Sequence, residues 1–338
     1  MVNKNTKLNW LVKKKEGLYC IPGKFYIDPI LPVENALITH AHSDHARPYN
    51  KNILSSIETI ELMKVRYGEH YCTSFENPDY RKRQKINEVN VTLYPAGHIL
   101  GSVQFLIEFN GYRLLISGDY KRSKDLTCKE YEPIKCHTFI TEATFGLPIF
   151  SHPCDERETN RLIESLEDNI TEIHLVGVYA LGKCQRLITL LRAQGYDKTI
   201  FLHGALMKIS KYYEDIGIKL GSIKNVSDVP LNQLSGHLIL CPPSALNNKW
   251  SQKFRNVKKG YVSGWMKIKQ RVKQKNIELP IIISDHSDWK EILSTIEDVS
   301  PSEVLVTHGR EEALVYYLNK KNYLTKALNL IGFEDENE

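Results

Sequence analysis

Histidine and aspartate gather at the end of one short apolar run, in a pattern that suits a metal ion. The run LITHAHSDH, residues 37–45, carries His40, His42, Asp44 and His45. Zinc accepts imidazole nitrogen and carboxylate oxygen, and several ligands from one tight loop pre-organise a site at low entropic cost. The spacing therefore predicts a metal site. The structural alternative is a set of solvated loop histidines.

Two more apolar runs downstream end in a glycine followed by a possible ligand. They are Pro95-Ala-Gly-His98 and Ile116-Ser-Gly-Asp119. Taken alone, His98 or Asp119 would more often be a buried polar residue satisfied by its neighbours. The repetition of strand, glycine and ligand favours the metal interpretation for both.

The elements that would position these residues change in character along the chain. Short β-rich runs at 36–39, 91–94, 103–107 and 112–117 dominate the first third, with a hairpin turn expected at Asn110-Gly111. From about residue 155, helical patterns at 156–168 and 182–193 alternate with strand patterns at 172–177, 198–202 and 237–241. This alternation predicts an α/β unit with parallel strands. Near the end, strands at 280–284 and 303–307 each precede a helix, at 289–296 and 310–318.

The ordered set HxHxDH, then a lone histidine, then a lone aspartate resembles the metallo-β-lactamase fold. The resemblance implies that His40, His42 and His98 hold one zinc ion, that Asp44 and His45 hold a second, and that Asp119 bridges both. It also implies that Asp28, after the run Phe25-Tyr-Ile, orients the ligand loop from behind.

Three later motifs resemble the β-CASP nucleases within that fold: Ile140-Thr-Glu142, Ile283-Ser-Asp-His286-Ser-Asp and Val304-Leu-Val-Thr-His308-Gly. The resemblance implies that Glu142 hydrogen-bonds His286, that His286 is the general acid, and that His308 is a further zinc ligand. The chain is most similar to the bacterial ligase-associated DNA exonucleases, through residues 95–102, 117–122, 139–148 and 179–186. That similarity covers nearly the whole chain.

The implied architecture is α/β, a four-layer αββα metallo-β-lactamase sandwich with an inserted α/β β-CASP cap domain. The expected boundaries are 1–147 and 278–338 for the two parts of the metallo-β-lactamase lobe and 148–277 for the cap. No Pro/Gly/Ser-rich linker marks these boundaries, so they fall inside continuously folded sequence.

The implied activity is zinc-dependent hydrolysis of phosphodiester bonds by a DNA exonuclease, in repair or end processing. Two metal ions, zinc with manganese as an alternative, would activate a hydroxide and stabilise the attacking and leaving oxygens. The expected catalytic residues are Asp44, Glu142 and His286, with His286 protonating the departing oxygen. By resemblance, a DNA ligase and a helicase are possible partners.

Residues expected to bind substrate lie near these motifs: Lys121, Arg122, Gly182, Lys183 and Ser284. The segment 177–184 matches a phosphate-binding loop except at Cys184, where magnesium binding needs a hydroxyl, so we expect a substrate phosphate at Gly182 and Lys183 and no ATP. Tyr261 and Trp265 lie among basic residues and offer either a base-stacking platform or core packing.

Composition bears on the kind of partner and on the location expected for the protein. The net charge is +5, and local basic clusters favour a polyanionic partner. No apolar run approaches the roughly 20 residues of a membrane helix, which predicts a cytoplasmic protein without a membrane partner. An RNA nuclease, a non-catalytic nucleic-acid-binding subunit and a small-molecule hydrolase remain as alternatives, and the oligomeric state is not indicated.

Overall fold

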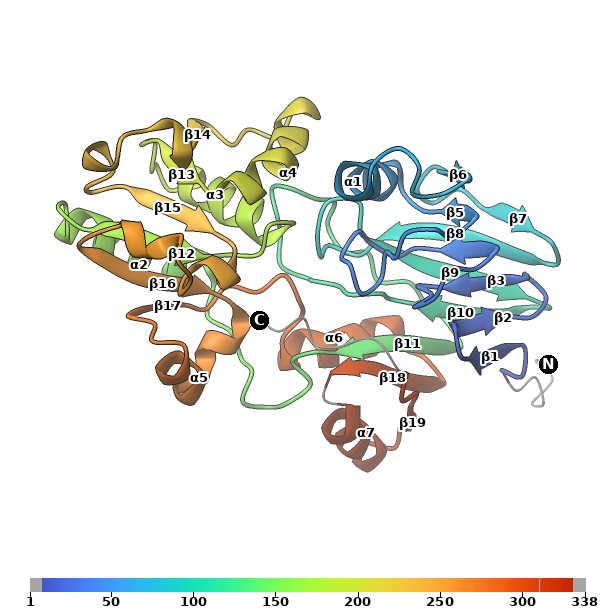
Figure 1. Ribbon diagram of the computed structural model, residues 1–338. Helices are drawn as coiled ribbons and strands as arrows, with labels where there is room; N and C mark the ends of the chain where they lie inside the picture. Colours follow the sequence, from blue (N-terminus) through green and yellow to red (C-terminus); the bar gives the residue numbers. More distant parts are fainter. Residues whose placement is uncertain (1–7, 310, 331–338) are drawn as a thin grey trace. The chain divides into compact units, whose positions relative to one another are not determined.

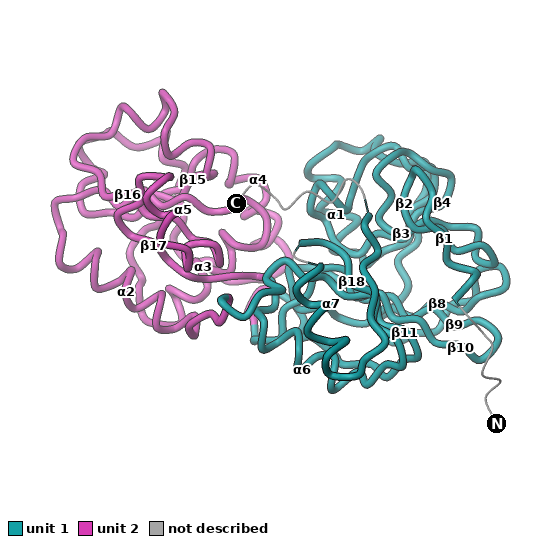
Figure 2. Tube along the Cα trace, turned by 90° about the horizontal axis from the view of Figure 1, so that it is seen from below, with its two compact units in different colours: residues 1–124, 128–149, 286–337 teal, residues 125–127, 150–285, 338 magenta. Residues whose placement is uncertain are grey.

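The computed structural model describes residues 8–309 and 311–330, and the chain divides into two compact units (Figure 2). Unit 1 consists of residues 1–124, 128–149 and 286–337, and unit 2 holds residues 125–127 and 150–285. Arg310, predicted to begin a helix, and the outer ends of the predicted domains lie outside the described residues.

Unit 1 is built on two β-sheets (Figure 1). The first has six strands in chain order: β1 (Leu11–Lys14), β2 (Gly17–Cys20), β3 (Phe25–Ile27), β4 (Asn35–Leu37), β5 (Asn52–Leu54) and β6 (Ser74–Glu76). The second has the order β19 (Leu324–Ala327), β18 (Glu303–Gly309), β11 (Thr138–Ala143), β10 (Tyr112–Ile116), β9 (Val103–Phe109), β8 (Val89–Pro95) and β7 (Gln84–Ile86). One apolar core contains residues of both sheets, among them Leu18, Leu37, Val91 and Phe105. The two sheets therefore pack face to face.

Helices form the outer layers of unit 1. Helices α6 (Trp289–Val299) and α7 (Glu311–Lys320) pack on the second sheet, where Ile292 and Leu314 join Phe139 and Val306 in a separate core. Helix α1 (Ile57–Tyr67) buries Ile60, Leu62 and Met63. The four-layer αββα arrangement predicted above is confirmed.

Two local features connect the sequence to this sheet order. Asn110 and Gly111 both have positive φ, 47° and 79°, as a two-residue type I′ turn requires, and they join β9 to β10 in the predicted hairpin. Strands β11 and β18 pair in parallel, with Thr138 opposite Glu303, although unit 2 separates them in the chain. The second sheet thus joins segments from both sides of the insertion.

Unit 2 is an α/β unit with an all-parallel sheet, as predicted. The strand order is β14 (Ile223–Asn225), β13 (Ile200–Leu202), β15 (Leu238–Cys241), β12 (Ile173–Gly177), β16 (Val257–Val262) and β17 (Leu279–Ile281). Its helices are α2 (Asp155–Asp168), α3 (Lys183–Ala193), α4 (Gly204–Asp215) and α5 (Lys269–Gln274). No helix in the described part of the chain is long and apolar enough to cross a membrane.

A buried cation joins the first short segment of unit 2 to the rest of the unit. The Arg186 side chain on α3 is 1% exposed and lies 3.1 Å from Asp125 and 2.6 Å from Asp155. Removing one partner of such a buried pair typically costs about 3–5 kcal/mol, because a charge is left without compensation. Residues 125–127 are therefore held firmly to α3.

Candidate metal centre

The loop of residues 38–45, here called the ligand loop, follows β4 directly, and its histidine side chains are buried. His40, His42 and His45 are at most 5% exposed, and Asp44 is half-buried. The backbone N–H groups of His45 and Ala46 both donate to the carbonyl of His42, which closes the loop into a tight turn. The four closely spaced residues of the sequence motif thus lie on one compact loop.

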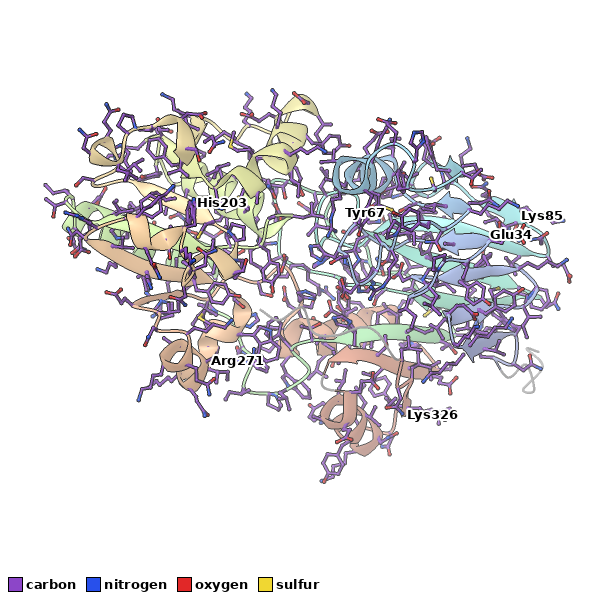
Figure 3. All side chains as sticks on the ribbon, in the orientation of Figure 1. Glu34, Tyr67, Lys85, His203, Arg271 and Lys326 are labelled. Atoms are coloured by element: carbon purple, nitrogen blue, oxygen red, sulfur yellow. The ribbon has the colours of Figure 1, made fainter. Side chains whose placement is uncertain are left out.

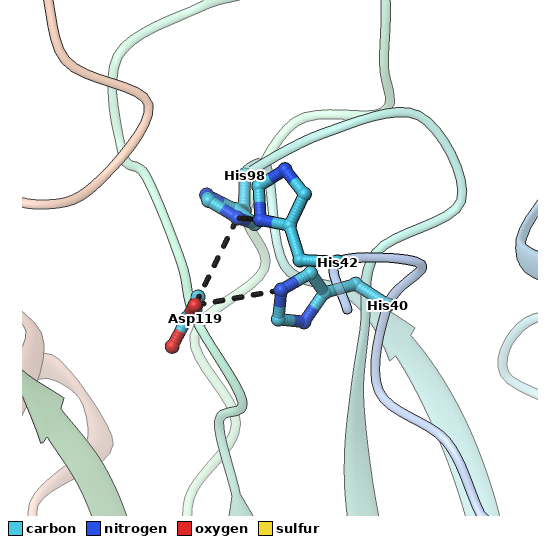
Figure 4. A group of neighbouring side chains, drawn as sticks. All are labelled: His40, His42, His98 and Asp119. Carbon is cyan, nitrogen blue, oxygen red and sulfur yellow. Dashed lines mark hydrogen bonds and ion pairs between the residues drawn. The ribbon is translucent and has the colours of Figure 1, made fainter. Parts of the chain in front are cut away.

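Three histidines and one aspartate form the first cluster (Figure 4). Asp119 Oδ2 lies 3.4 Å from His40 Nε2 and 3.9 Å from His98 Nε2. His98 Nε2 lies 3.1 Å from His42 Nδ1. One ligand atom of each residue lies within 4.8 Å of every other, a separation that a single ion can span.

Asp44, His45 and His308 form a second cluster, which also lies near Asp119. His45 Nε2 is 3.6 Å from Asp44 Oδ2 and 3.4 Å from Asp119 Oδ2. The ring centroid of His308 lies 5.5 Å from that of His45. Asp119 is therefore close to the ligand atoms of both clusters.

Buried polar atoms at this centre fit the demands of a divalent cation. Among the described residues, His40 Nε2, Asp44 Oδ1 and Asp119 Oδ1 are buried without a hydrogen-bond partner. Such atoms are costly unless something satisfies them, and each is a ligand type that zinc or manganese accepts. The donor set therefore fits a metal site.

The electrostatics of the cluster favour a positive centre. Burial, reinforced by the charge of His45, holds the pKa of His40 well below its usual value. Burial also opposes charge on His45, but the carboxylates of Asp119 and Asp44 outweigh it and raise the pKa of His45 well above its usual value. The same carboxylates would attract a metal cation, whose binding requires neutral imidazoles and releases protons.

Glycine precedes two of these ligands because the backbone there has no room for a side chain. Gly97 has φ +75°, and a Cβ atom on it would lie 2.2 Å from the carbonyl oxygen of Lys121. Gly118 has φ +56°, and a Cβ atom on it would lie 2.7 Å from Thr39 Cβ. The glycines before His98 and Asp119 thus let the strand ends approach the ligand loop closely.

Asp28 holds the ligand loop in place through hydrogen bonds. Its Oδ1 accepts the backbone N–H of Thr39 at 2.7 Å, while its Oδ2 accepts the Thr39 hydroxyl at 2.6 Å and lies 2.8 Å from His45 Nδ1. Asp28 and His308 both have positive φ, 41° and 57°, which costs a non-glycine residue about 1–3 kcal/mol. The fold therefore holds two strained residues at this centre.

We expect Asp28→Asn to weaken metal binding by about 10–100-fold, because the amide loses the carboxylate charge that orients the His45 ring. The measurement is metal content after dialysis against buffers of graded free zinc. Asp79→Asn, at an exposed carboxylate in unit 1, is the matched control. Equal affinity in both variants would show that Asp28 has no role in metal binding.

A histidine and a glutamate form a pair beside the first cluster. His286 Nδ1 lies 3.0 Å from Glu142 Oε2, and the His286 ring centroid lies 4.6 Å from that of His98. The Tyr120 N–H and the Thr144 hydroxyl donate to Glu142 at 2.9 and 2.5 Å and hold its carboxyl group in place. Glu142 thus fixes the orientation of the His286 ring.

The structure places two of the residues expected to bind substrate in ion pairs with α6. Lys121 is 5% exposed and contacts Glu291 at 2.8 Å, and Arg122 contacts Asp298 at 2.6 Å. This placement supports a structural role for both side chains. Their contact with substrate stays a prediction.

The other expected substrate contacts lie in unit 2. Gly182 is the N-cap of α3, and its N–H donates to the Gln185 side chain at 2.9 Å. Lys183 is 1% exposed and pairs with Asp285 at 3.2 Å, next to the buried Ser284. A role in binding phosphate stays a prediction for all three.

The base-stacking interpretation of Tyr261 and Trp265 is wrong. They are 0% and 3% exposed, and Tyr261 belongs to the apolar core of unit 2. Both rings fill space between elements of unit 2 and are closed to a nucleic-acid base.

Some residues at the centre carry no signal in the sequence. Thr39 connects Asp28 to the loop, and Thr144 and the Tyr120 N–H bind Glu142. Phe145 packs edge-on to His286 with ring centroids 6.2 Å apart. Only their position beside a motif residue could have drawn attention to them.

Similarity to known proteins agrees with this geometry. Over 307 residues the chain is 28% identical to a probable DNA ligase of Opitutus terrae, matching 89% of this chain and 29% of that protein. Over 241 residues it is 36% identical to endoribonuclease ysh-1 of Neurospora crassa, matching 59% of this chain and 27% of that protein. The chain therefore spans less than a third of the length of these curated relatives. No protein-family model matches it.

A solved structure supports the fold alone. The crystal structure of a protein of unknown function from Enterococcus faecalis V583 matches 89% of this chain and 80% of that one, with a TM-score of 0.58 and 13% identity.

Two facing sheets between helices, with metal-binding residue types at the strand ends, define a metallo-β-lactamase fold carrying an inserted α/β unit. Together with the relatives described above, this fold is consistent with the metallo-β-lactamase/β-CASP nuclease family.

Proposed function

We propose that this chain is a metal-dependent nuclease, specifically a DNA exonuclease that acts in repair or end processing. The observation that carries the proposal is the pair of buried ligand clusters around Asp119, with His286 and Glu142 beside them. A centre with metal ligands on one side and an oriented proton donor on the other suits hydrolysis of a phosphodiester.

The proposed metal ligands divide between the two clusters. His40, His42 and His98 would hold one zinc ion, Asp44, His45 and His308 would hold another, and Asp119 would serve both, with manganese as an alternative metal. Bound divalent metals would lower the pKa of a water molecule and neutralise charge on the phosphate. Asp44 belongs to the catalytic set because its carboxylate would contact both metal and water.

The chain's own residues supply the proton for the leaving oxygen. Glu142 accepts a hydrogen bond from His286 Nδ1, so the opposite edge of the ring is the one that delivers a proton. The hydrogen bond to Glu142 would also stabilise the protonated imidazole. His286 is therefore proposed as the general acid, with Glu142 as its positioning residue.

The preference for DNA over RNA rests on how much of this chain each relative matches. The probable DNA ligase matches 89% of this chain, whereas the endoribonuclease matches 59%. A relative in which the matched region is part of a longer protein named as a ligase supports DNA as substrate. It also supports a DNA ligase as partner. A helicase partner and a cytoplasmic location are parts of the same proposal.

RNA is the second candidate substrate. Identity to endoribonuclease ysh-1 reaches 36%, higher than the 28% to the probable DNA ligase. A protein distinguishes RNA from DNA through contacts to the 2′-hydroxyl group of the sugar, so the choice of substrate is decided by direct comparison of the two polymers.

The test is digestion of matched, end-labelled single-stranded DNA and RNA by the zinc- or manganese-loaded chain, with product lengths resolved on a gel. Stepwise shortening of DNA is the expected result and would give the polarity. Cutting confined to RNA would replace the DNA proposal with a ribonuclease. Cleavage of neither polymer under both metals would count against a nuclease.

A further inference from the structure

The positive charge of this protein is concentrated in one part of unit 2. Residues 245–276 contain ten lysines and arginines and no aspartate or glutamate. The other 306 residues hold 35 basic and 40 acidic side chains, a net charge of −5. The overall charge of +5 therefore arises entirely from this segment.

Half of these cations lie in nine consecutive residues at and around α5. They are Lys267, Lys269, Arg271, Lys273 and Lys275, here called the α5 cationic surface. Lys267, Lys269 and Lys273 are exposed, and α5 has no fully buried residue. Arg271 is labelled on this helix in Figure 3.

Helix α5 packs against the core of unit 2 through an apolar side chain, while Lys269 and Lys273 are exposed to solvent. Val272 packs against the core of unit 2 that contains Ile277, and the Ile277 N–H donates to the carbonyl of Val272 at 3.1 Å. The Arg271 guanidinium lies 3.9 Å from the centroid of the buried Trp265 ring. These contacts hold the α5 cationic surface in place on unit 2.

Four of these five cations lack the acidic partners that accompany many other basic residues in the described part of the chain. Among the described residues, no carboxylate lies within ion-pair distance of Lys267, Lys269, Arg271 or Lys273. Elsewhere Lys51, Lys64 and Arg81 each pair with a glutamate, at 3.1, 3.0 and 2.7 Å. Like charges kept together without counter-charges destabilise a folded chain slightly, and a polyanion would remove that cost.

We infer that the α5 cationic surface binds the sugar-phosphate backbone of a nucleic acid strand, without sequence preference. The identity of this polyanion rests on the proposed function. Lysine contacts phosphate as a point charge and does not distinguish one base from another. The other side chains of this segment are the exposed Gln270 and Gln274 and the half-buried Ile268 and Val272. A membrane is disfavoured because α5 presents no exposed apolar face to insert.

The test compares two triple variants of the full, metal-loaded chain. Lys267→Gln/Lys269→Gln/Lys273→Gln removes three charges from the surface. Lys208→Gln/Lys219→Gln/Lys224→Gln removes three exposed lysines elsewhere in unit 2 and is the matched control. Both keep the buried residues of the unit, and thermal melting checks that each variant folds.

The probe is a labelled oligothymidylate with a phosphorothioate backbone, which resists hydrolysis, and binding is followed by fluorescence anisotropy over a range of salt. We expect the α5 variant to bind at least about tenfold more weakly at low salt, with a slope of log Kd against log salt lower by about 2. The control variant should resemble the unaltered chain. An oligoadenylate probe should give the same result.

Four outcomes would overturn the inference: equal binding by the two triple variants, no binding by the unaltered chain, a strong preference between the two probes, or binding only to phosphatidylserine vesicles. Binding and cleavage are read separately. If the α5 variant binds more weakly than the control but the unaltered chain cleaves no nucleic acid, the inference about the α5 cationic surface stands and the proposed nuclease function is refuted. If the unaltered chain cleaves nucleic acid and the two triple variants bind equally, the nuclease function stands and the inference is refuted.

Discussion

Replacing Asp119 by alanine is expected to remove metal binding and cleavage together. Asp119 lies 3.4 Å from both His40 and His45, so it reaches residues of both clusters. We expect cleavage to fall by at least about 10²–10³-fold, with a matching loss of bound metal. Metal content by atomic spectroscopy and digestion of labelled DNA give the two readouts.

Asp79→Ala is the control for this change, because Asp79 is an exposed carboxylate of the same unit. It should keep both metal and activity. A chain with Asp119→Ala that retains its full metal content would remove Asp119 from the ligand set. One that retains its activity would place the chemistry elsewhere in the molecule.

His286→Ala should separate the two properties. The His286 ring is held by Glu142 at 3.0 Å, and we propose that it gives a proton to the leaving oxygen without binding metal. We expect the metal content to stay unchanged and kcat on DNA to fall by about 10²–10⁴-fold. His70→Ala, at an exposed histidine of unit 1, is the control.

A substrate that needs no general acid distinguishes this role from a structural one. A nitrophenyl phosphodiester has a leaving group that departs without a proton, so His286→Ala should hydrolyse it nearly as well as the unaltered chain does. An equal loss on both substrates would mean that the variant damages the centre as a whole. Loss of metal would make His286 a ligand.

The ligand loop was open to prediction because its residues are contiguous. His40, His42, Asp44 and His45 come from six residues of sequence, and no long-range packing is needed to bring them together. The glycines at 97 and 118 could be interpreted in the same local way, since each precedes a polar residue at a strand end. The α/β character of unit 2 followed from the alternation of strands and helices, which depends on local periodicity, whereas the four-layer architecture was implied by resemblance.

The support for the centre was not open to prediction, because it depends on contacts far apart in the chain. Thr144 and the Tyr120 backbone reach Glu142, and Lys121 turns away into a pair with Glu291, 170 residues further along. Trp265 looked like a binding residue among cations and is a core residue. Sequence shows which charges are near in the chain, and only the fold shows which are paired.

The parallel pairing of β11 with β18 bears on how the protein is made. His286 and His308 follow unit 2 in the chain, so a ribosome has translated all of unit 2 before the last of the proposed ligands exists. Until then β11 is an unpaired edge strand, and its partner must be brought across a folded insertion, a step that high sequence separation makes slow. A nascent or truncated chain would carry six of the seven histidine and aspartate residues proposed as ligands on its first half, but not the proposed proton donor. Hydrolytic activity would therefore begin only after unit 2 and the residues that follow it have been synthesised.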